Sequence, residues 1–217
     1  MSGPPPLAVE NRAGVSAANS DTRAFAEWIA RQRPRSLLDV GTGTGYVAIR
    51  LALDGCRVAA TELSPAAARL SESNARRHGV ALEVRIGDLL EGIKGRWQAI
   101  AFNPPFSAGV DPALVARAKQ IVRRLGPFER RLMRRPPRAV LAFRRDLVRR
   151  FVLQALEHLE PGGALYLLLY AQELEALASI SPDLDVIAEA TDALRRRNLR
   201  VVRVSAGSGG RTDRTAR

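Results

Sequence analysis

Short apolar runs alternate along the chain with longer segments in which apolar residues recur every three or four positions. Each run is bounded by glycine, proline or charged residues, which is typical of buried strands. Five runs are expected to form strands: residues 36–40, 57–61, 82–86, 97–102 and 165–170. The longest uninterrupted apolar stretch has eight residues, at 164–171, whereas a membrane-spanning helix needs about 20. The pattern therefore predicts a buried sheet and no membrane span.

The segments between these runs predict helices. Residues 20–32 place Phe25, Trp28 and Ile29 on one helical face, with Ser20 or Asp21 as the N-terminal cap. Further helices are expected from about residue 45 and over residues 65–77, 146–159 and 172–179. In the helix over 146–159, the apolar stripe consists of Leu147, Phe151, Leu153, Ala155 and Leu156.

The end of the chain predicts two more strands. Pro161, Gly162 and Gly163 are expected to turn the chain before the fifth strand. Residues 186–190 and 199–205 can pair as the last two strands. Alternating strands and helices imply right-handed crossovers and a mainly parallel sheet covered on both faces. The expected fold class is therefore α/β, with a doubly wound, Rossmann-like sheet of seven strands.

This pattern also predicts the domain organisation. We expect a flexible N-terminal arm over residues 1–19, one domain over 20–205 and a disordered tail over 206–217, which is rich in Gly, Ser and charge. After the fourth strand the alternation is interrupted by a basic, helical insertion at about residues 107–145.

Composition narrows the class of protein. A chain of 217 residues with 46% hydrophobic and 26% charged residues is long enough for one globular domain with a sizeable core. One cysteine and two histidines provide neither an intramolecular disulfide nor a plausible metal site. No long apolar stretch follows a positively charged start, so we expect no secretory leader and a cytoplasmic protein.

The net charge of +12 is concentrated in one region. Residues 107–150 contain 13 basic and three acidic residues, which suggests that an anionic partner docks there. The alternative is that these charges line solvated helix faces in an arginine-rich chain, since 32 of the 34 basic residues are arginine.

The loop after the first strand carries glycine at every second position. It reads Gly41, Thr42, Gly43, Thr44 and Gly45. A dinucleotide site would place its third glycine one residue later, where Tyr46 stands, so the spacing argues against NAD. It suits a ligand without a pyrophosphate, whose polar end lies along this backbone. Asp39, just before the loop, offers a carboxylate to a cationic group.

Two more carboxylates follow the next two strands. Glu62, after the second strand, can accept hydrogen bonds from both hydroxyls of a ribose, and Asp88, after the third, can accept from an adenine amino group. The alternatives are that Glu62 caps the following helix and that Asp88 is a turn residue. Because the carboxyl ends of parallel strands meet at one edge of the sheet, the three loops together favour an adenosine-containing ligand.

Together with Asn103, Pro104, Pro105 and Phe106 after the fourth strand, these loops resemble the class I S-adenosylmethionine-dependent methyltransferases. The chain is most similar to their small-domain group, whose Asn-Pro-Pro-aromatic motif marks methylation of planar nitrogens, and the resemblance covers roughly residues 21–205. It implies S-adenosylmethionine as cofactor, with Gly41, Gly43 and Gly45 against its methionine part, Glu62 on the ribose and Asp88 on the adenine. The full set of candidate cofactor residues is Asp39, Gly41, Thr42, Gly43, Gly45, Glu62, Asp88 and Asn103.

The Asn-Pro-Pro motif suits a weakly nucleophilic nitrogen. The side-chain carbonyl of Asn103 and the backbone carbonyl of Pro104 can accept the two N–H bonds of an amide or exocyclic amine, and so orient its lone pair and stabilise developing positive charge. Pro104 and Pro105 have no N–H to compete and fix the backbone, and Phe106 can stack on the planar group. The alternative is a simple Pro-Pro turn.

Within this group the sequence is similar to RNA guanine or adenine N-methyltransferases and to protein glutamine methyltransferases, but it departs from both subgroups. Glutamine-methylating members usually have tyrosine where Phe106 stands, and their bacterial forms have an extra helical domain in front. Asp21 and Thr22 at the first helix resemble the shorter glutamine methyltransferases. The basic insertion resembles neither subgroup.

Three functions remain in view. The first expectation is methylation of an exocyclic base amine in structured RNA or a ribosomal component, with Phe106 under the base and phosphates bound by Arg130, Arg131, Arg134 and Arg135. The second is methylation of a glutamine in a translation factor or ribosomal protein. The third is a non-catalytic RNA-binding module of the same fold, against which the intact Asn103 motif speaks. The sequence predicts no oligomeric state.

Overall fold

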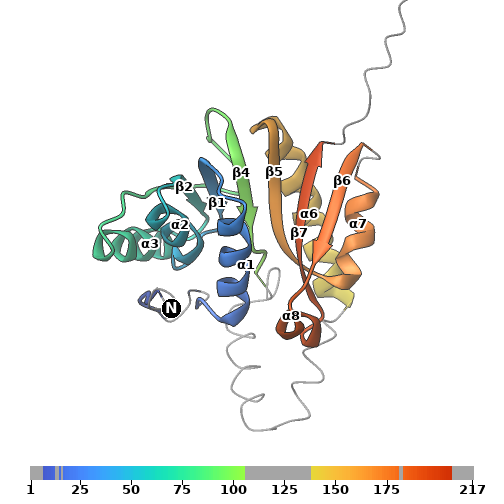
Figure 1. Ribbon diagram of the computed structural model, residues 1–217, viewed down its shortest axis with the longest axis horizontal. Coiled ribbons are helices and arrows are strands. Elements are labelled where there is room, and N and C mark those ends of the chain that lie inside the picture. Colours follow the sequence, from blue (N-terminus) through green and yellow to red (C-terminus); the bar gives the residue numbers. More distant parts are fainter. Residues whose placement is uncertain (1–6, 13–14, 16, 106–137, 181–182, 207–217) are drawn as a thin grey trace, which may run out of the picture.

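The fold is built around one seven-stranded sheet with the order β3-β2-β1-β4-β5-β7-β6 (Figure 1). The structure is a computed structural model that describes residues 7–12, 15, 17–105, 138–180 and 183–206. The strands are β1 (Ser36–Val40), β2 (Arg57–Glu62), β3 (Glu83–Ile86), β4 (Trp97–Phe102), β5 (Leu159–Tyr170), β6 (Leu184–Glu189) and β7 (Leu199–Ala206). The predicted seven-stranded, mainly parallel α/β fold is confirmed.

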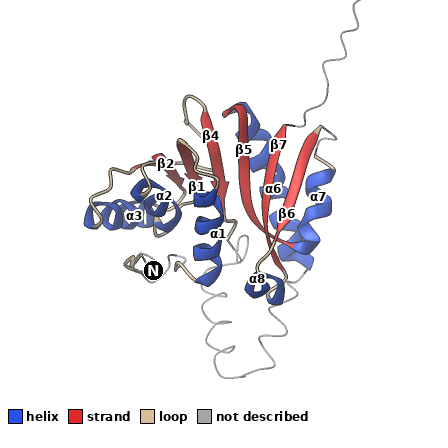
Figure 2. Cartoon of the chain, in the orientation of Figure 1, coloured by secondary structure: helices blue, strands red, loops and turns tan. Residues whose placement is uncertain are grey.

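Helices cover both faces of the sheet (Figure 2). They are α1 (Ser20–Arg31), α2 (Tyr46–Leu53), α3 (Pro65–Arg77), α6 (Arg138–Glu157), α7 (Leu174–Ala178) and α8 (Asp192–Arg196), with the 3₁₀ turn η1 (Ala171–Glu173). Phe25 of α1 packs in one core cluster with Leu37 and Tyr166, whereas Phe151 of α6 packs in the other with Leu38 and Leu165. Alternate residues of each strand thus face opposite layers.

The first five strands run parallel and end at one edge of the sheet. Strand β1 pairs with β2 on one side and β4 on the other, with Val40 opposite both Thr61 and Phe102. The loops after β1, β2 and β4 therefore begin at the same level. The last two strands pair with each other, as expected; they run antiparallel, and β7 is also antiparallel to β5.

Two local expectations were wrong. The cap of α1 is Asn19, not Ser20 or Asp21: its side-chain oxygen accepts from the backbone N–H groups of Asp21 and Thr22, and an Asn is as good a cap as Ser or Asp.

The second wrong expectation is that residues 161–163 turn the chain before the fifth strand. These residues instead lie within β5, at a shift in its register with β4. Trp97 pairs with Leu159, whereas Ala99 pairs with Ala164. Glycine is needed at 163 because a Cβ there would lie 2.7 Å from the carbonyl oxygen of Gln98.

Helix α6 is longer than predicted, because it begins at Arg138 and ends at Glu157. Its buried stripe contains Phe151 and Ala155, as predicted, but also Val148 and Val152, while Leu153 is 42% exposed. The helix thus starts inside the segment expected to be the basic insertion. Residues 106–137 lie outside the described residues.

The described part of the N-terminal segment contacts α3. Asn74 accepts a hydrogen bond from the Glu10 backbone N–H and donates one to the Glu10 carbonyl, at 2.9 and 3.1 Å. The flexibility expected of residues 1–19 stays a prediction, as does that of the tail, most of which lies outside the described residues. In the part of the chain that the structure describes, no helix is long and apolar enough to cross a membrane.

Candidate active site

The glycine loop follows β1 at the carboxyl edge of the sheet. Gly41, Gly43 and Gly45 all have positive φ, at 64°, 57° and 83°, a conformation that side chains disfavour. At Gly45 a Cβ would also lie 3.0 Å from the Cβ of Ser71 in α3. The sequence Gly-x-Gly-x-Gly therefore builds a tight turn whose backbone carries no side chain at three of its five positions.

Asp39 lies beneath this loop with 3% of its surface exposed. Its Oδ2 accepts from the hydroxyl of Thr42 at 2.6 Å and from the N–H of Ala48, in the first turn of α2, at 3.3 Å. Burial raises the pKa of Asp39 to about 7, although these two hydrogen bonds oppose the shift and nearby Glu62 adds to it. A cation near the loop would favour the ionised form.

Glu62, the last residue of β2, joins two loops. Its Oε2 accepts from the backbone N–H of Gly43 at 2.9 Å, and its Oε1 accepts from the N–H of Ser64 at 3.0 Å. Each carboxylate oxygen has lone pairs for a further bond, so both can still accept from ligand hydroxyls. The alternative that Glu62 caps α3 is wrong. The cap is Ser64, whose hydroxyl accepts from the backbone N–H of Ala67.

Asp88 follows β3, as expected, and pairs with Arg150 of α6. The two side chains are 44% and 43% exposed, so solvent screens the pair and it contributes little to stability. Asp88 thus lies near the loops after β1 and β2, and one of its carboxylate oxygens contacts Arg150. Its expected bond to an adenine stays a prediction.

Asn103 follows β4 and contacts the start of α1. Its Nδ2 donates to the Thr22 hydroxyl at 3.5 Å. The Thr22 hydroxyl in turn donates to the Oδ1 of the cap Asn19 at 3.2 Å. The amide N–H₂ group of Asn103 thus points to α1. Its carbonyl oxygen accepts from no donor among the described residues and has lone pairs to accept from another molecule.

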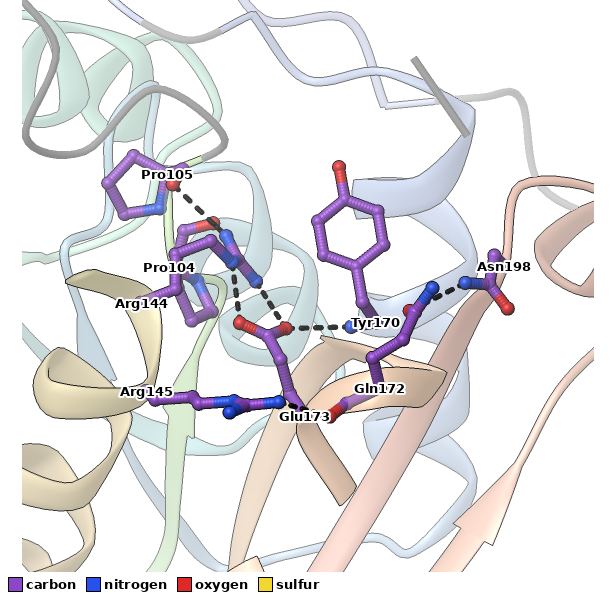
Figure 3. A network of polar contacts seen from close by, with 8 residues as sticks. All are labelled: Pro104, Pro105, Arg144, Arg145, Tyr170, Gln172, Glu173 and Asn198. Atoms are coloured by element: carbon purple, nitrogen blue, oxygen red, sulfur yellow. Dashed lines mark hydrogen bonds and ion pairs between the residues drawn. The ribbon is translucent and has the colours of Figure 1, made fainter. Parts of the chain in front are cut away.

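A side chain of α6, Arg144, donates hydrogen bonds to the two prolines after Asn103 (Figure 3). The Nη1 of Arg144 donates to the carbonyl oxygens of Pro104 and Pro105 at 2.8 and 3.0 Å. The opposite edge of the guanidinium, Nε and Nη2, donates to the two carboxylate oxygens of Glu173 at 2.7 and 3.0 Å. This contact was not expected from the sequence.

The structure thus gathers the described candidates at one edge of the sheet: Asp39, Gly41, Thr42, Gly43, Gly45, Glu62, Asp88, Asn103, Pro104 and Pro105. Their expected roles in binding stay predictions. Phe106 and the four candidate phosphate-binding residues, Arg130, Arg131, Arg134 and Arg135, lie outside the described residues. Among the described residues, no group of three His, Cys, Asp or Glu side chains is arranged to hold a metal ion.

Sequence reasoning missed Arg144 and Glu173. A signal was present, because Arg144 lies four and seven residues before Val148 and Phe151 and so falls on the buried stripe of α6. A charged residue on such a stripe needs a buried partner. The partner itself, 29 residues further on, could not be identified without the fold.

Comparison of the sequence with known proteins shows which family the chain matches. Residues 7–130 match the family model described as methyltransferase small domain. The release factor glutamine methyltransferase of Koribacter versatilis (strain Ellin345) is 34% identical over 153 residues, which cover 66% of this chain and 50% of the relative. That of Deinococcus radiodurans is 34% identical over 178 residues, covering 74% and 59%. The chain therefore spans between half and two thirds of the length of these curated relatives.

Solved structures share the fold at lower identity. The ribosomal protein L11 methylase of Lactobacillus delbrueckii subsp. bulgaricus superimposes with a TM-score of 0.62 at 17% identity, covering 90% of this chain and 83% of that one. The T. thermophilus 16S rRNA N2 G1207 methyltransferase, solved with AdoMet and guanosine, gives a TM-score of 0.60 at 17% identity, covering 90% and 45%.

Proposed function

The chain belongs to the methyltransferase small domain family, whose members use S-adenosylmethionine, and we propose that it methylates the side-chain amide nitrogen of a glutamine in a protein. The single structural observation that supports methylation of a planar nitrogen is the position of Asn103. Its amide N–H₂ faces Thr22 of α1, and its carbonyl oxygen, to which no described residue donates, can accept from the N–H of a planar substrate amide.

The cofactor fits the residues present. S-adenosylmethionine supplies an electrophilic methyl group on a sulfonium, with an ammonium and a ribose beside it. Asp39 offers a carboxylate beneath the glycine loop, and Glu62 keeps lone pairs on both oxygens for hydroxyl groups. The positive-φ glycines leave the loop backbone open to close approach.

The proposed chemistry needs orientation rather than a strong base. An amide nitrogen is a poor nucleophile because its lone pair is delocalised. As the N–C bond forms, the S–CH₃ bond of the sulfonium would break and S-adenosylhomocysteine would leave; the nitrogen proton becomes acidic only then and would pass to water. The carbonyls of Asn103 and Pro104 would accept the two N–H bonds of the glutamine amide and stabilise positive charge as it develops. Pro104 already accepts one bond from Arg144, and its second lone pair can accept another.

The similarity of sequence favours glutamine over RNA. The relatives at 34% identity carry the name release factor glutamine methyltransferase, whereas the rRNA methyltransferase at 17% identity shares the fold alone. The Thr22–Asn103 contact is consistent with this choice, because Asp21 and Thr22 are the residues that resemble the shorter glutamine methyltransferases. Structured RNA, the first expectation from the sequence, is the second candidate because of the basic residues over 107–150.

The two candidate substrates are distinguished by which of them receives a labelled methyl group. The protein is incubated with methyl-labelled S-adenosylmethionine and either RNase-treated cell extract or purified structured RNA. We expect label in the protein fraction of the RNase-treated extract and none in the RNA. Label in RNA alone would overturn the proposal in favour of the RNA substrate, and binding without transfer to either would favour the non-catalytic module.

A further inference from the structure

A buried ion pair lies directly behind the Asn-Pro-Pro loop. Arg144 of α6 and Glu173 of η1 are each only 1% exposed, and their contact at 2.7 Å joins two elements 29 residues apart (Figure 3). Burying two charges costs solvation that their mutual attraction repays only with further hydrogen bonds. What Arg144 and Glu173 bind besides each other therefore indicates what the pair does.

The planar guanidinium uses two different edges. Nε and Nη2 form a two-point contact with the carboxylate of Glu173, and Nη1, which carries two hydrogens, donates to both Pro104 and Pro105. A carboxylate and two carbonyls are thus held by one rigid, planar donor group. Lysine, with a single ammonium on a flexible stem, cannot reproduce this arrangement.

Glu173 is fixed as firmly as Arg144. Its Oε2 also accepts from the backbone N–H of Tyr170 at 2.8 Å, at the end of β5. Strand β5 pairs with β4, the strand that leads into Asn103. The loop after β4 is therefore tied to its neighbouring strand through two side chains.

The loop needs such an external anchor because of its own sequence. Pro104 and Pro105 lack backbone N–H groups, so the loop cannot be held by donors at these two positions. Its carbonyls can still accept, and Arg144 supplies the donors. The carboxylate of Glu173 also neutralises the charge of Arg144. A guanidinium without this partner would oppose positive charge on a substrate nitrogen bound at Pro104.

We propose that Arg144 and Glu173 are positioning residues that hold the carbonyls of Pro104 and Pro105, and with them Asn103, in the geometry that receives the substrate nitrogen. This inference rests on the proposed function only in taking the Asn-Pro-Pro loop as the acceptor site. It holds for any planar nitrogen bound there.

The test replaces the pair by apolar residues of similar size. Because such a swap in a buried pair is often neutral or stabilising, the double variant Arg144→Met/Glu173→Leu is expected to fold. The control is Arg50→Met/Glu27→Leu, which removes another two-point arginine–glutamate pair, between α2 and α1. That pair is more exposed, and Arg50 also contacts Asp54. Thermal unfolding and calorimetric affinity for S-adenosylmethionine are measured for both.

The rate of methyl transfer is then measured on whichever acceptor, protein or RNA, the wild-type protein labels. We expect the Arg144/Glu173 double variant to lose about 10- to 100-fold in maximal rate, with unchanged cofactor affinity, and the control to keep the wild-type rate. Arg144→Lys should also lose rate. A folded double variant with the wild-type rate overturns the positioning role while leaving the proposed function intact.

A second readout does not depend on activity. The side-chain amide of Asn103 gives an NMR signal that reports its surroundings. We expect this signal to shift or broaden in the Arg144/Glu173 double variant and to stay in place in the control. An unmoved signal in the double variant overturns the proposal even if no acceptor is found, whereas absence of any transfer by the wild-type protein counts against the proposed function alone.

Discussion

The carboxylate of Glu62, at the end of β2, accepts a hydrogen bond from the backbone N–H of Gly43 at 2.9 Å. This bond joins the glycine loop after β1 to the neighbouring strand. The same carboxylate accepts from Ser64 N–H at 3.0 Å. Glu62 therefore shapes the site as well as offering acceptors to a ligand, and a substitution there acts through both.

Loss of Glu62 should weaken cofactor binding. Glu62→Ala removes a charged acceptor from the ribose hydroxyls, and hydrogen bonds to charged groups contribute about 1.5 to 3 kcal/mol, or roughly 10- to 150-fold in affinity. Calorimetry with S-adenosylmethionine measures the change. Glu62→Gln keeps the size of the side chain and one carbonyl oxygen, so its loss should be smaller. Wild-type affinity in a folded Glu62→Ala protein would remove Glu62 from the cofactor site.

Cofactor affinity should depend on pH through Asp39. The pKa of its carboxyl is raised to about 7, so below pH 7 the free protein carries this group largely neutral. A cofactor ammonium favours the carboxylate and lowers its pKa in the complex, so binding releases a proton. Affinity should therefore fall by up to about tenfold for each pH unit below 7, measured by calorimetry from pH 8 to pH 6.

Asp39→Asn is the control for this pH dependence. It keeps an oxygen that can accept from Thr42 and Ala48 but cannot ionise. The affinity of this variant should be weak and nearly constant below pH 7. Any pH dependence that remains should come from titration of the cofactor itself. An identical pH profile in Asp39→Asn and wild type would show that Asp39 is not the titrating group.

Gly45 should not tolerate a side chain. Gly45→Ala combines an unfavourable positive φ with a Cβ only 3.0 Å from Ser71 Cβ and 3.2 Å from Ile49 Cδ1, so we expect a loss of about 2 to 4 kcal/mol in the free energy of unfolding. Gly55 is a matched control, because its φ is 85° but no heavy atom lies within 4 Å of the position that a Cβ would take there.

Gly55→Ala should cost only about 1 to 2 kcal/mol, the conformational part of the penalty. Denaturant unfolding of the two variants isolates the steric part as their difference. Equal losses would mean that α3 moves away freely and that the close packing of Gly45 is not what requires glycine.

Asn103 should matter for turnover rather than for cofactor affinity. Asn103→Ala removes a carbonyl that interacts most strongly as charge develops, so we expect the rate to fall by on the order of 100-fold or more. Affinity for S-adenosylmethionine should stay within a few-fold. A full rate in this variant would reduce the motif to a turn at the end of β4.

The apolar pattern of the sequence predicted the sheet well, since the ends of β1 and β4 agree with the structure to the residue. Buried parallel strands read as continuous apolar runs, and the loops after them follow directly. The insertion of residues 161–163 into β5 could not be predicted, because Pro-Gly-Gly reads as a turn and only the partner strand β4 reveals the register shift.

The placement of single candidate residues could be predicted, since Asp39, Glu62 and Asn103 lie at the carboxyl ends of their strands as expected, while their roles stay predictions. The site was not predictable where the contact is made by side chains far apart in the chain. Arg144 read as one more basic residue in an arginine-rich segment, and only the packing of α6 on the sheet brings it to Glu173. The Arg150–Asp88 pair is of the same kind.

The most direct test of the central claim is identification of the atom that receives the methyl group. Proteins labelled with isotopically marked S-adenosylmethionine by the wild-type protein are digested by proteases, and the labelled residue is identified by mass spectrometry. The account predicts N-methylglutamine, formed on the order of 100-fold more slowly when Asn103→Ala replaces the wild type. A methyl group on a nucleic acid base, or on an amino acid other than glutamine, would contradict it.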